Sequence, residues 1–204
     1  MANQKITLPF PTARILVVSD FNCPYCFCLN EWLVAIGWSD RVRWVGIEHR
    51  PHLPHSGENN AEDRDALETE VRDVQQRAPE TKTALPPLWA NSRSALLAQN
   101  ALEDEAPEAA HAFRTALFRR YWQRGELPSE ALIGEVSREL GLPRLAPEPE
   151  HLDELTTWWR DHLDRIPCML APTGVVHLGL QDLPTVKSFV NSALHSAEEG
   201  PGCR

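Results

Sequence analysis

The stretch VSDFNCPYCFCLN, residues 18–30, holds three of the five cysteines of this 204-residue chain. Cys23 and Cys26 form a Cys-Pro-Tyr-Cys motif, and Cys28 follows two positions later. Such a cluster can be a redox pair, part of a metal site, or packing that contains sulfur. Where the motif lies in the predicted fold distinguishes these interpretations.

The residues around the motif predict a strand followed by a helix. Four consecutive aliphatic residues, 15–18, are typical of a short strand that is covered on both faces. Asn22 is a favourable N-cap, Pro24 suits a first helical turn, and apolar residues continue to Ile36 before Gly37 ends the helix. The motif therefore lies at the start of the first predicted helix.

The rest of the chain predicts a second strand, a long helical block, and a return to strands. Val, Trp and Ile are frequent in residues 41–51, as expected for a strand. A predicted hairpin covers residues 166–180, and residues 183–197 predict a closing helix. Between these parts, helical periodicity occurs in five segments, at about 67–78, 92–104, 109–124, 129–140 and 150–165.

The order β-α-β, helical block, β-β-α is typical of a thioredoxin-like α/β fold, in which helices flank a central mixed sheet. A large all-α insertion interrupts this order. We expect a discontinuous thioredoxin-like domain formed by residues 10–56 and 165–198, and a helical insertion domain formed by residues 57–164.

Composition and charge exclude several classes of function. No apolar run approaches the roughly 20 residues that a membrane helix needs, so we expect no membrane partner. The formal net charge is -9 with acids and bases interleaved, which argues against a nucleic-acid partner. The N-terminus lacks the features of a signal peptide, and five cysteines is an odd number, so we expect a cytoplasmic protein with reduced or reactive thiols.

Helical geometry predicts different surroundings for the two motif cysteines. At about 100° per residue, Cys26 lies on the apolar side of the helix and should be shielded. Cys23 lies at the first turn, at the end that we expect to be exposed, where free N–H groups and the helix dipole stabilise a thiolate. An accessible thiolate can attack a disulfide and a shielded partner can resolve the mixed disulfide, so the pair predicts thiol–disulfide exchange.

The other sulfur and imidazole groups do not predict a metal site. Cys28 lies about 200° round the helix from Cys26, where packing is the favoured interpretation. No second Cys-x-x-Cys motif is present. His49, His52 and His55 recur at every third residue and would stand about 9 Å apart in a polyproline-type segment, so we expect a solvated loop there.

Pro167 strengthens the redox interpretation. Thioredoxin-type folds place a cis X-Pro bond at the head of the returning strand, and here Ile166 precedes Pro167 at that position. The backbone of Ile166 would then be presented for pairing with an extended substrate peptide. The alternative is an ordinary trans proline at the start of a strand.

With both features in place, the chain resembles the DsbA-like branch of the thioredoxin superfamily, and more closely its cytoplasmic FrnE-like members. The resemblance covers roughly residues 14–197. It implies a thiol–disulfide oxidoreductase that acts on protein or glutathione disulfides without a metal or nucleotide, with glutathione as a candidate co-substrate. The similar segments are SDFNCPYC (19–26), IEHRPHLP (47–54), NSRSALLAQNAL (91–102) and the hairpin from IPCML to VVHLGLQ (166–181).

By this resemblance Cys23 is the nucleophilic cysteine, Cys26 the resolving cysteine and Pro167 the cis-proline. The CPYC motif also resembles that of glutaredoxins, but the long helical insertion before Pro167 favours the DsbA-like branch. The residues expected to contact substrate are Pro24, Tyr25, Ile166 and Pro167.

Two other functions remain open. Kappa-class glutathione transferases and hydroxychromene-carboxylate isomerases are related proteins that place a serine where Cys23 stands. Cys23 therefore argues against that chemistry, and a glutathione-dependent transferase or isomerase is kept as the second enzymatic alternative. The non-enzymatic alternative is a chaperone-like binding module that keeps the cleft without turnover.

Several residues near the motif are candidate accessories. Thioredoxin and the periplasmic DsbA enzymes resemble each other in a buried acid six residues before the first cysteine, where this chain has Val17. Asp20 lies closer to the motif and is a candidate local charge or proton relay. Cys168, directly after the proposed cis-proline, is either a third redox thiol or a small residue of the strand core. Tyr25, between the cysteines, is expected to be exposed.

Overall fold

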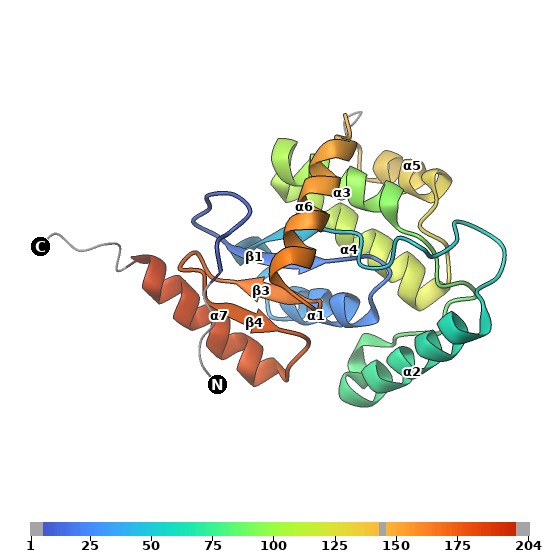
Figure 1. Ribbon diagram of the computed structural model, residues 1–204, viewed down its shortest axis with the longest axis horizontal. Coiled ribbons are helices and arrows are strands. Elements are labelled where there is room, and N and C mark those ends of the chain that lie inside the picture. Colours follow the sequence, from blue (N-terminus) through green and yellow to red (C-terminus); the bar gives the residue numbers. More distant parts are fainter. Residues whose placement is uncertain (1–5, 143–145, 199–204) are drawn as a thin grey trace, which may run out of the picture.

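The computed structural model describes residues 6–142 and 146–198, which form a thioredoxin-like α/β fold with a helical insertion (Figure 1). The chain begins with the predicted β-α-β unit: β1 (Ile15–Ser19), α1 (Pro24–Ala35), a short 3-10 turn η1 (Ser39–Arg41) and β2 (Val42–Gly46). The second strand is shorter than the predicted segment, because the chain leaves the ladder soon after Ile47 donates its N–H to the Ser19 carbonyl at 3.0 Å.

The mixed sheet has the strand order β2-β1-β3-β4. Strand β1 pairs in parallel with β2 and antiparallel with β3 (Cys168–Leu170), which pairs antiparallel with β4 (Val176–Leu178). In this register Val18 lies opposite Cys168, and Cys168 lies opposite Leu178. The ends of β1, β2 and β4 and the start of β3 therefore meet at one side of the sheet, which we term the Cys23 edge.

Within the described residues, five helices lie between β2 and β3, as the sequence predicts, and α3–α6 form the helical insertion. In Figure 1, α6 crosses in front of β1 and β3, while α1 lies behind them. The domain boundaries at residues 57 and 165 stay predictions. The helices are α2 (Ala61–Arg77), α3 (Arg93–Glu105), α4 (Pro107–Arg124), α5 (Glu130–Glu139), α6 (Pro149–His162) and the closing α7 (Leu183–Glu198), with a 3-10 turn η2 (Pro79–Thr81) after α2.

Local capping explains two of the helix starts. Helix α2 begins earlier than its apolar stripe suggests because the Asn60 side chain accepts a hydrogen bond from the Asp63 N–H. Helix α5 begins after the predicted cap Ser129, whose hydroxyl accepts from the Leu132 N–H.

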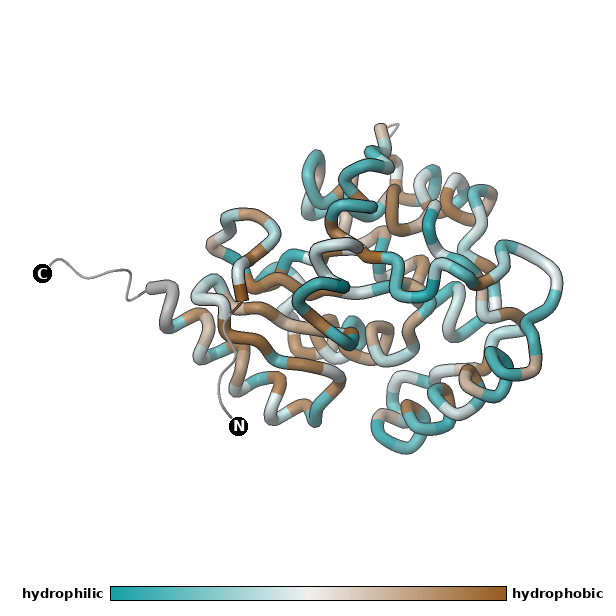
Figure 2. The backbone as a smooth tube through the Cα atoms, in the orientation of Figure 1, coloured by the Kyte–Doolittle hydropathy of each residue, from teal (hydrophilic) through white to brown (hydrophobic). Residues whose placement is uncertain are grey.

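One hydrophobic core joins the sheet to the insertion. The ring of Phe118 on α4 lies 4.8 Å from that of Phe21 and 6.3 Å from that of Trp44, between centroids. Figure 2 shows hydrophobic residues concentrated in the strands, whereas α2 is mostly hydrophilic. Because the insertion completes the core, its side chains can reach the loop that precedes α1.

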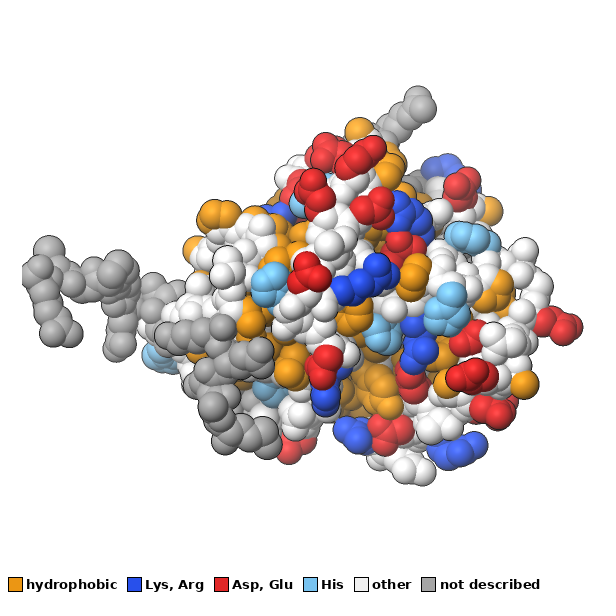
Figure 3. All heavy atoms as spheres, in the orientation of Figure 1, with side chains coloured by type: hydrophobic (Ala, Val, Ile, Leu, Met, Phe, Trp, Pro, Cys, Tyr) orange, Lys and Arg blue, Asp and Glu red, His pale blue; other side chains and the backbone are white. Residues whose placement is uncertain are grey.

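Within the described residues no helix is long and apolar enough to cross a membrane. On the face drawn in Figure 3, acidic and basic side chains are interspersed.

The fifth cysteine, Cys203, lies outside the described residues.

Candidate active site

The motif begins at the first turn of α1, but the N-cap is Cys23 rather than the predicted Asn22. Cys23 is extended, with φ -103 and ψ 115, and its carbonyl accepts the N–H groups of Cys26 at 3.1 Å and Phe27 at 3.2 Å. The ring of Pro24 disfavours a helical conformation for the residue before it, so the helix cannot start earlier. This rule could have placed the cap from the sequence.

Both motif cysteines are free thiols, and both are buried. Cys26 is 0% exposed as expected, but Cys23 is only 3% exposed, so the prediction of an exposed Cys23 is wrong. Burial raises the pKa of Cys26 well above its ordinary value, and the hydrogen bond to Cys23 raises it further. Cys26 is therefore a protonated thiol next to Cys23.

The other two described cysteines are also buried. Cys28 and Cys168 are 0% exposed. Burial raises the pKa of Cys168 to about 12, and burial together with Glu80 and Glu31 raises the pKa of Cys28. Their surroundings are those of core residues that keep their protons at neutral pH. This agrees with packing for Cys28 and favours the strand-core alternative for Cys168.

Asp20 is a buried carboxylate beside the shielded thiol. Its side chain accepts hydrogen bonds from the N–H of Asn22 at 3.3 Å, the N–H of His49 at 2.8 Å and the hydroxyl of Ser92. Burial raises the pKa of Asp20 to about 6, although these three bonds favour the charged form. Its negative charge also contributes to the raised pKa of Cys26.

The helical insertion holds the loop before the motif. The indole N–H of Trp89 donates to the Asn22 carbonyl at 2.6 Å, and that of Trp122 donates to the Phe21 carbonyl at 2.9 Å. Ser92 is the N-cap of α3, but its hydroxyl bonds to Asp20 instead of to its own helix. Sequence patterns gave no sign of these contacts, because each joins residues far apart in the chain.

The strand register brings Pro167 to the Cys23 edge. The Ile166–Pro167 peptide bond is cis, and the Pro167 carbonyl accepts the Gly179 N–H at 2.8 Å. Ile166 is 6% exposed. Because Cys168 pairs with Val18, Pro167 lies beside the segment that leads into the motif. The register thus brings Ile166 and Pro167 to the edge of the sheet at which the Cys-Pro-Tyr-Cys motif begins.

Tyr25 is partly buried rather than exposed. Its hydroxyl donates to the Asp73 carboxylate on α2 at 3.0 Å. Burial and this bond raise the pKa of Tyr25, and the nearby charges of Asp73, Glu70 and Cys23 raise it further. Pro24, the neighbouring motif residue, is buried. The correction for Tyr25 arises from its contact with α2.

The three histidines have different surroundings: His52 and His55 are exposed, as expected of a solvated loop, but the prediction is wrong for His49. The ring of His49 packs edge-on against Trp159 of α6, with centroids 5.4 Å apart, and burial lowers the pKa of His49 to about 4. His52 lies 3.2 Å from the Asp63 carboxylate, while His55 is exposed. Across residues 6–142 and 146–198, no group of three or more His, Cys, Asp or Glu side chains is arranged to hold a metal ion.

Three solved structures share this fold. A candidate protein disulfide isomerase from Nitrosomonas europaea aligns with a TM-score of 0.68 and 15% identity, over 89% of this chain and 97% of that one. A 2-hydroxychromene-2-carboxylate isomerase aligns with a TM-score of 0.65 and 18% identity, over 92% of this chain and 99% of that one. A candidate DsbA oxidoreductase from Streptomyces coelicolor aligns with a TM-score of 0.59 and 11% identity, over 94% of this chain and 92% of that one.

Sequence comparison gives the family. No curated protein matches the chain. The family model of the DSBA-like thioredoxin domain matches residues 14–150, which is more than half of the chain and includes the motif, Asp20 and most of the insertion. The chain therefore belongs to the DSBA-like thioredoxin domain family.

Proposed function

We propose that this protein is a thiol–disulfide oxidoreductase that cycles Cys23 and Cys26 between dithiol and disulfide. The observation that carries this proposal is the asymmetric pair at the start of α1, in which the protonated Cys26 is hydrogen-bonded to Cys23 beside the buried Asp20. Membership of the DSBA-like family supports it. A thiolate is the form of cysteine that attacks disulfides, and we assign this attack to Cys23 at the start of α1.

The reaction proceeds through a mixed disulfide. The Cys23 thiolate attacks one sulfur of a substrate disulfide, a Cys23–substrate bond forms, and the other sulfur leaves as a thiolate. Cys26 then loses its proton and attacks the Cys23 sulfur, which releases the second substrate thiolate and closes the Cys23–Cys26 disulfide. Two electrons pass from the pair to the substrate, and the reverse sequence oxidises a substrate dithiol.

Asp20 is suited to accept the proton that Cys26 must lose. With a pKa of about 6, its carboxyl group is mostly ionised at neutral pH and still basic enough to bind a proton. It takes the place of the buried acid that is missing at Val17, which is itself a fully buried strand residue. In the reverse direction, the same carboxyl group returns the proton to Cys26.

Protein disulfides or glutathione disulfide are the substrates that we infer. An extended peptide would pair with the backbone of Ile166 beside Pro167, and Pro24 and Tyr25 would flank its sulfur. We place the protein in the cytoplasmic FrnE-like branch because of the segments quoted above. Whether it acts as reductant, oxidant or isomerase follows from its reduction potential relative to that of the compartment.

Trapping of the mixed disulfide tests this proposal. The Cys26→Ser variant, incubated with oxidised glutathione, should accumulate one glutathione adduct, which mass spectrometry of peptides locates at Cys23. Wild type should resolve the adduct, and Cys23→Ser should form none. Cys28→Ser is the matched control and should behave as wild type. No adduct on Cys26→Ser, or an adduct at another cysteine, would contradict the proposal.

A glutathione-dependent isomerase is the second candidate, favoured by the structural likeness to a 2-hydroxychromene-2-carboxylate isomerase. It would convert a small electrophile with glutathione present while the number of protein thiols stays constant. A chaperone-like binding module would instead keep its holdase activity in Cys23→Ser. Counting the protein thiols during turnover separates the isomerase from disulfide exchange, because only disulfide exchange changes their number.

A further inference from the structure

Two of the hydrogen bonds to Asp20 come from residues that stand next to an ion pair. The His49 N–H, which donates to Asp20, follows Glu48 in the chain. The Ser92 hydroxyl, which also donates to Asp20, precedes Arg93. Glu48 and Arg93 pair with each other. The two segments that hold the proton acceptor therefore also bring one negative and one positive charge into its surroundings.

The backbone holds Glu48 beside Asp20. Glu48 is 8% exposed, and its N–H donates to the hydroxyl of Thr156 on α6 at 3.0 Å. The next N–H along the chain, that of His49, donates to Asp20 at 2.8 Å. Because both N–H groups are bonded, the backbone at Glu48 is fixed on both sides.

Arg93 joins Glu48 to α6. Its guanidinium also contacts the carboxylate of Asp153 at 2.8 Å. The hydrogen bond to Asp153, and then that to Glu48, raises the pKa of Arg93, which is therefore charged at neutral pH. Asp153 is well exposed and water screens its charge, whereas Glu48 is buried. Of the two carboxylates that Arg93 contacts, Glu48 is thus the one suited to act on Asp20.

Glu48 supplies a charge that acts on Asp20. Burial is the main cause of the raised pKa of Asp20, and the negative charge of Glu48 raises it further. Other titratable groups around this carboxyl group are neutral at pH 7. These are Cys26 on α1 and Tyr121 on α4, whose pKa values burial raises, and the ring of His49, whose pKa burial lowers to about 4.

We propose that the Glu48–Arg93 ion pair positions the proton acceptor of the resolving step, in that Glu48 keeps the Asp20 carboxylate basic and Arg93 limits this effect. The inference rests on the proposed function. Both residues act through Asp20 and not on the reacting sulfurs, so they are positioning residues. The two halves of the pair have opposite effects on the pH at which Asp20 accepts the Cys26 proton, because a like charge raises that pH and a neutralising charge lowers it.

Rapid mixing of the reduced protein with dithiodipyridine tests the ion pair. Attack by Cys23 releases one pyridinethione, resolution by Cys26 releases a second, and each absorbs light. The rate of the second release, measured from about pH 4 to about pH 8, gives the midpoint at which Asp20 accepts the proton. All chains carry Cys203→Ser, so that this thiol does not contribute. Cys26→Ser should show the first release only.

The two halves of the pair should shift this midpoint in opposite directions. In Glu48→Gln it should fall by about 0.5–1 pH unit, and in Arg93→Met it should rise by a similar amount. Glutamine keeps the size of the side chain and both backbone hydrogen bonds, so only the charge is lost.

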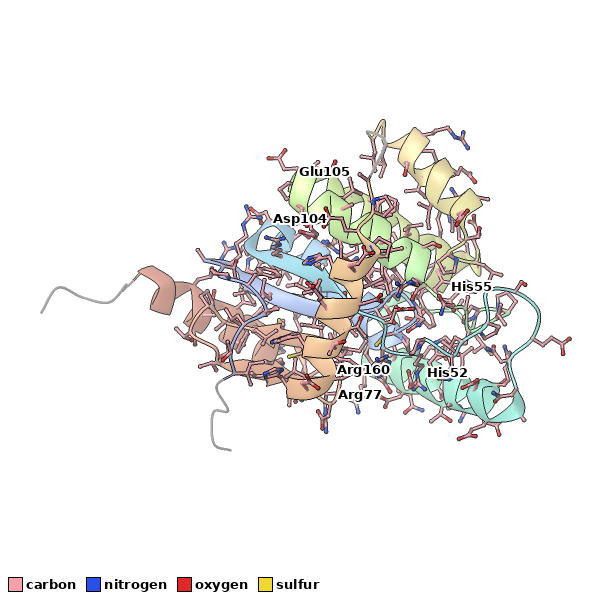
Figure 4. All side chains as sticks on the ribbon, turned by 45° about the horizontal axis from the view of Figure 1, so that its top comes forward. His52, His55, Arg77, Asp104, Glu105 and Arg160 are labelled. Carbon is pink, nitrogen blue, oxygen red and sulfur yellow. The ribbon has the colours of Figure 1, made fainter. Side chains whose placement is uncertain are left out.

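Glu154→Gln and Arg160→Met are the matched controls for net charge. Both side chains are exposed on α6, and Figure 4 shows Arg160 near the lower end of this helix. Neither makes a hydrogen bond or ion pair within residues 6–142 and 146–198, so both variants should keep the wild-type midpoint.

Unchanged midpoints in Glu48→Gln and Arg93→Met, shifts of both in the same direction, or equal shifts in the controls would each overturn the inference. The absence of a second release in wild type would instead remove the proposed function. Urea denaturation over the same pH range follows the titration of Asp20 without turnover, so opposite shifts of its midpoint would then decide whether the ion pair acts on Asp20.

Discussion

The Cys23 edge and the cluster around Arg114 both bury a charged side chain, but only one of them supplies a counter-charge. Arg114 on α4 is 2% exposed, donates to Glu103 at 3.0 Å and to Asn30 at 3.1 Å, and lies over the Trp44 ring at 4.4 Å. Asp20, 1% exposed, accepts hydrogen bonds only from neutral donors.

The difference separates a structural charge from a chemical one. Burial lowers the pKa of Arg114 to about 10, but Glu103 opposes this effect and Arg114 stays charged at neutral pH. Burial raises the pKa of Asp20 to about 6, so its proton can exchange under ordinary conditions. A paired buried charge fixes packing, whereas an unpaired one beside a thiol is available for proton transfer.

The largest effect is expected when the buried ion pair of Arg114 and Glu103 is broken. Arg114→Met removes the ion-pair partner of the buried Glu103, for which the charge of Arg43 compensates only in part, and should lower the free energy of unfolding by about 3–5 kcal/mol. Urea denaturation measures this change. The control is Arg119→Met, which removes an ion pair with Glu31 in which Arg119 is well exposed, and should cost at most about 1 kcal/mol. Equal costs for the two variants would contradict the distinction between the sites.

The buried Asp20, which has no counter-charge, should make the stability of the protein depend on pH. The pKa of Asp20 is higher in the folded state than its ordinary value of 3.8, so the native state holds this proton more tightly than the unfolded state does. The free energy of unfolding should therefore fall by about 3 kcal/mol as the pH rises through the window from about 4 to about 6.

Asp20→Asn should lose this component of the pH dependence. Urea denaturation gives the free energy of unfolding of wild type and of Asp20→Asn at pH 4 and at pH 7. The difference between the two proteins should change between these pH values by the contribution of Asp20. The same variant should slow the resolution of the Cys23 mixed disulfide by about 100-fold, because Cys26 loses its proton acceptor. A pH dependence identical to that of wild type would show that Asp20 does not titrate in this window.

A smaller effect is expected when one donor to Asp20 is removed. Ser92→Ala deletes a hydrogen bond that favours the charged carboxylate, so the pKa of Asp20 should rise above about 6. At pH 7 the cost should be about 1–2 kcal/mol. The pH midpoint of the stability change should move upward in this variant. A midpoint that stays at the wild-type pH would mean that the hydroxyl does not stabilise the charge.

The smallest effect concerns the contact between α1 and α2. Tyr25→Phe removes only the hydrogen bond to Asp73 and should lower the free energy of unfolding by about 0.5–1 kcal/mol. Urea denaturation measures this change. A free energy of unfolding equal to that of wild type would mean that this hydrogen bond contributes no net stability.

Local sequence rules predicted the features that depend on neighbouring residues. The aliphatic run of β1, the helix that follows the motif and the cap at Ser129 all follow from short-range preferences, as does the order of elements. The N-cap at Cys23 was within reach of the same rules, because Pro24 restricts the residue before it.

The features that escaped prediction depend on distant contacts. Tyr25 meets Asp73 across 48 positions, and Asp20 meets Ser92 across 72. Helical periodicity places neither pair together, so the partial burial of Tyr25 and the network around Asp20 were not predictable. Arg114 is a similar case, since nothing local marks an arginine in a charged helix as buried.

Redox equilibration tests the central claim most directly. The reduced protein is brought to equilibrium in graded glutathione buffers, the thiols are trapped, and the trapped groups are counted by mass for wild type, Cys23→Ser and Cys26→Ser. We predict one transition of two thiols in wild type that both variants lose, with Cys28 and Cys168 trapped as thiols throughout. A pair that stays reduced at every ratio, or a transition that survives in either variant, would contradict a Cys23–Cys26 couple.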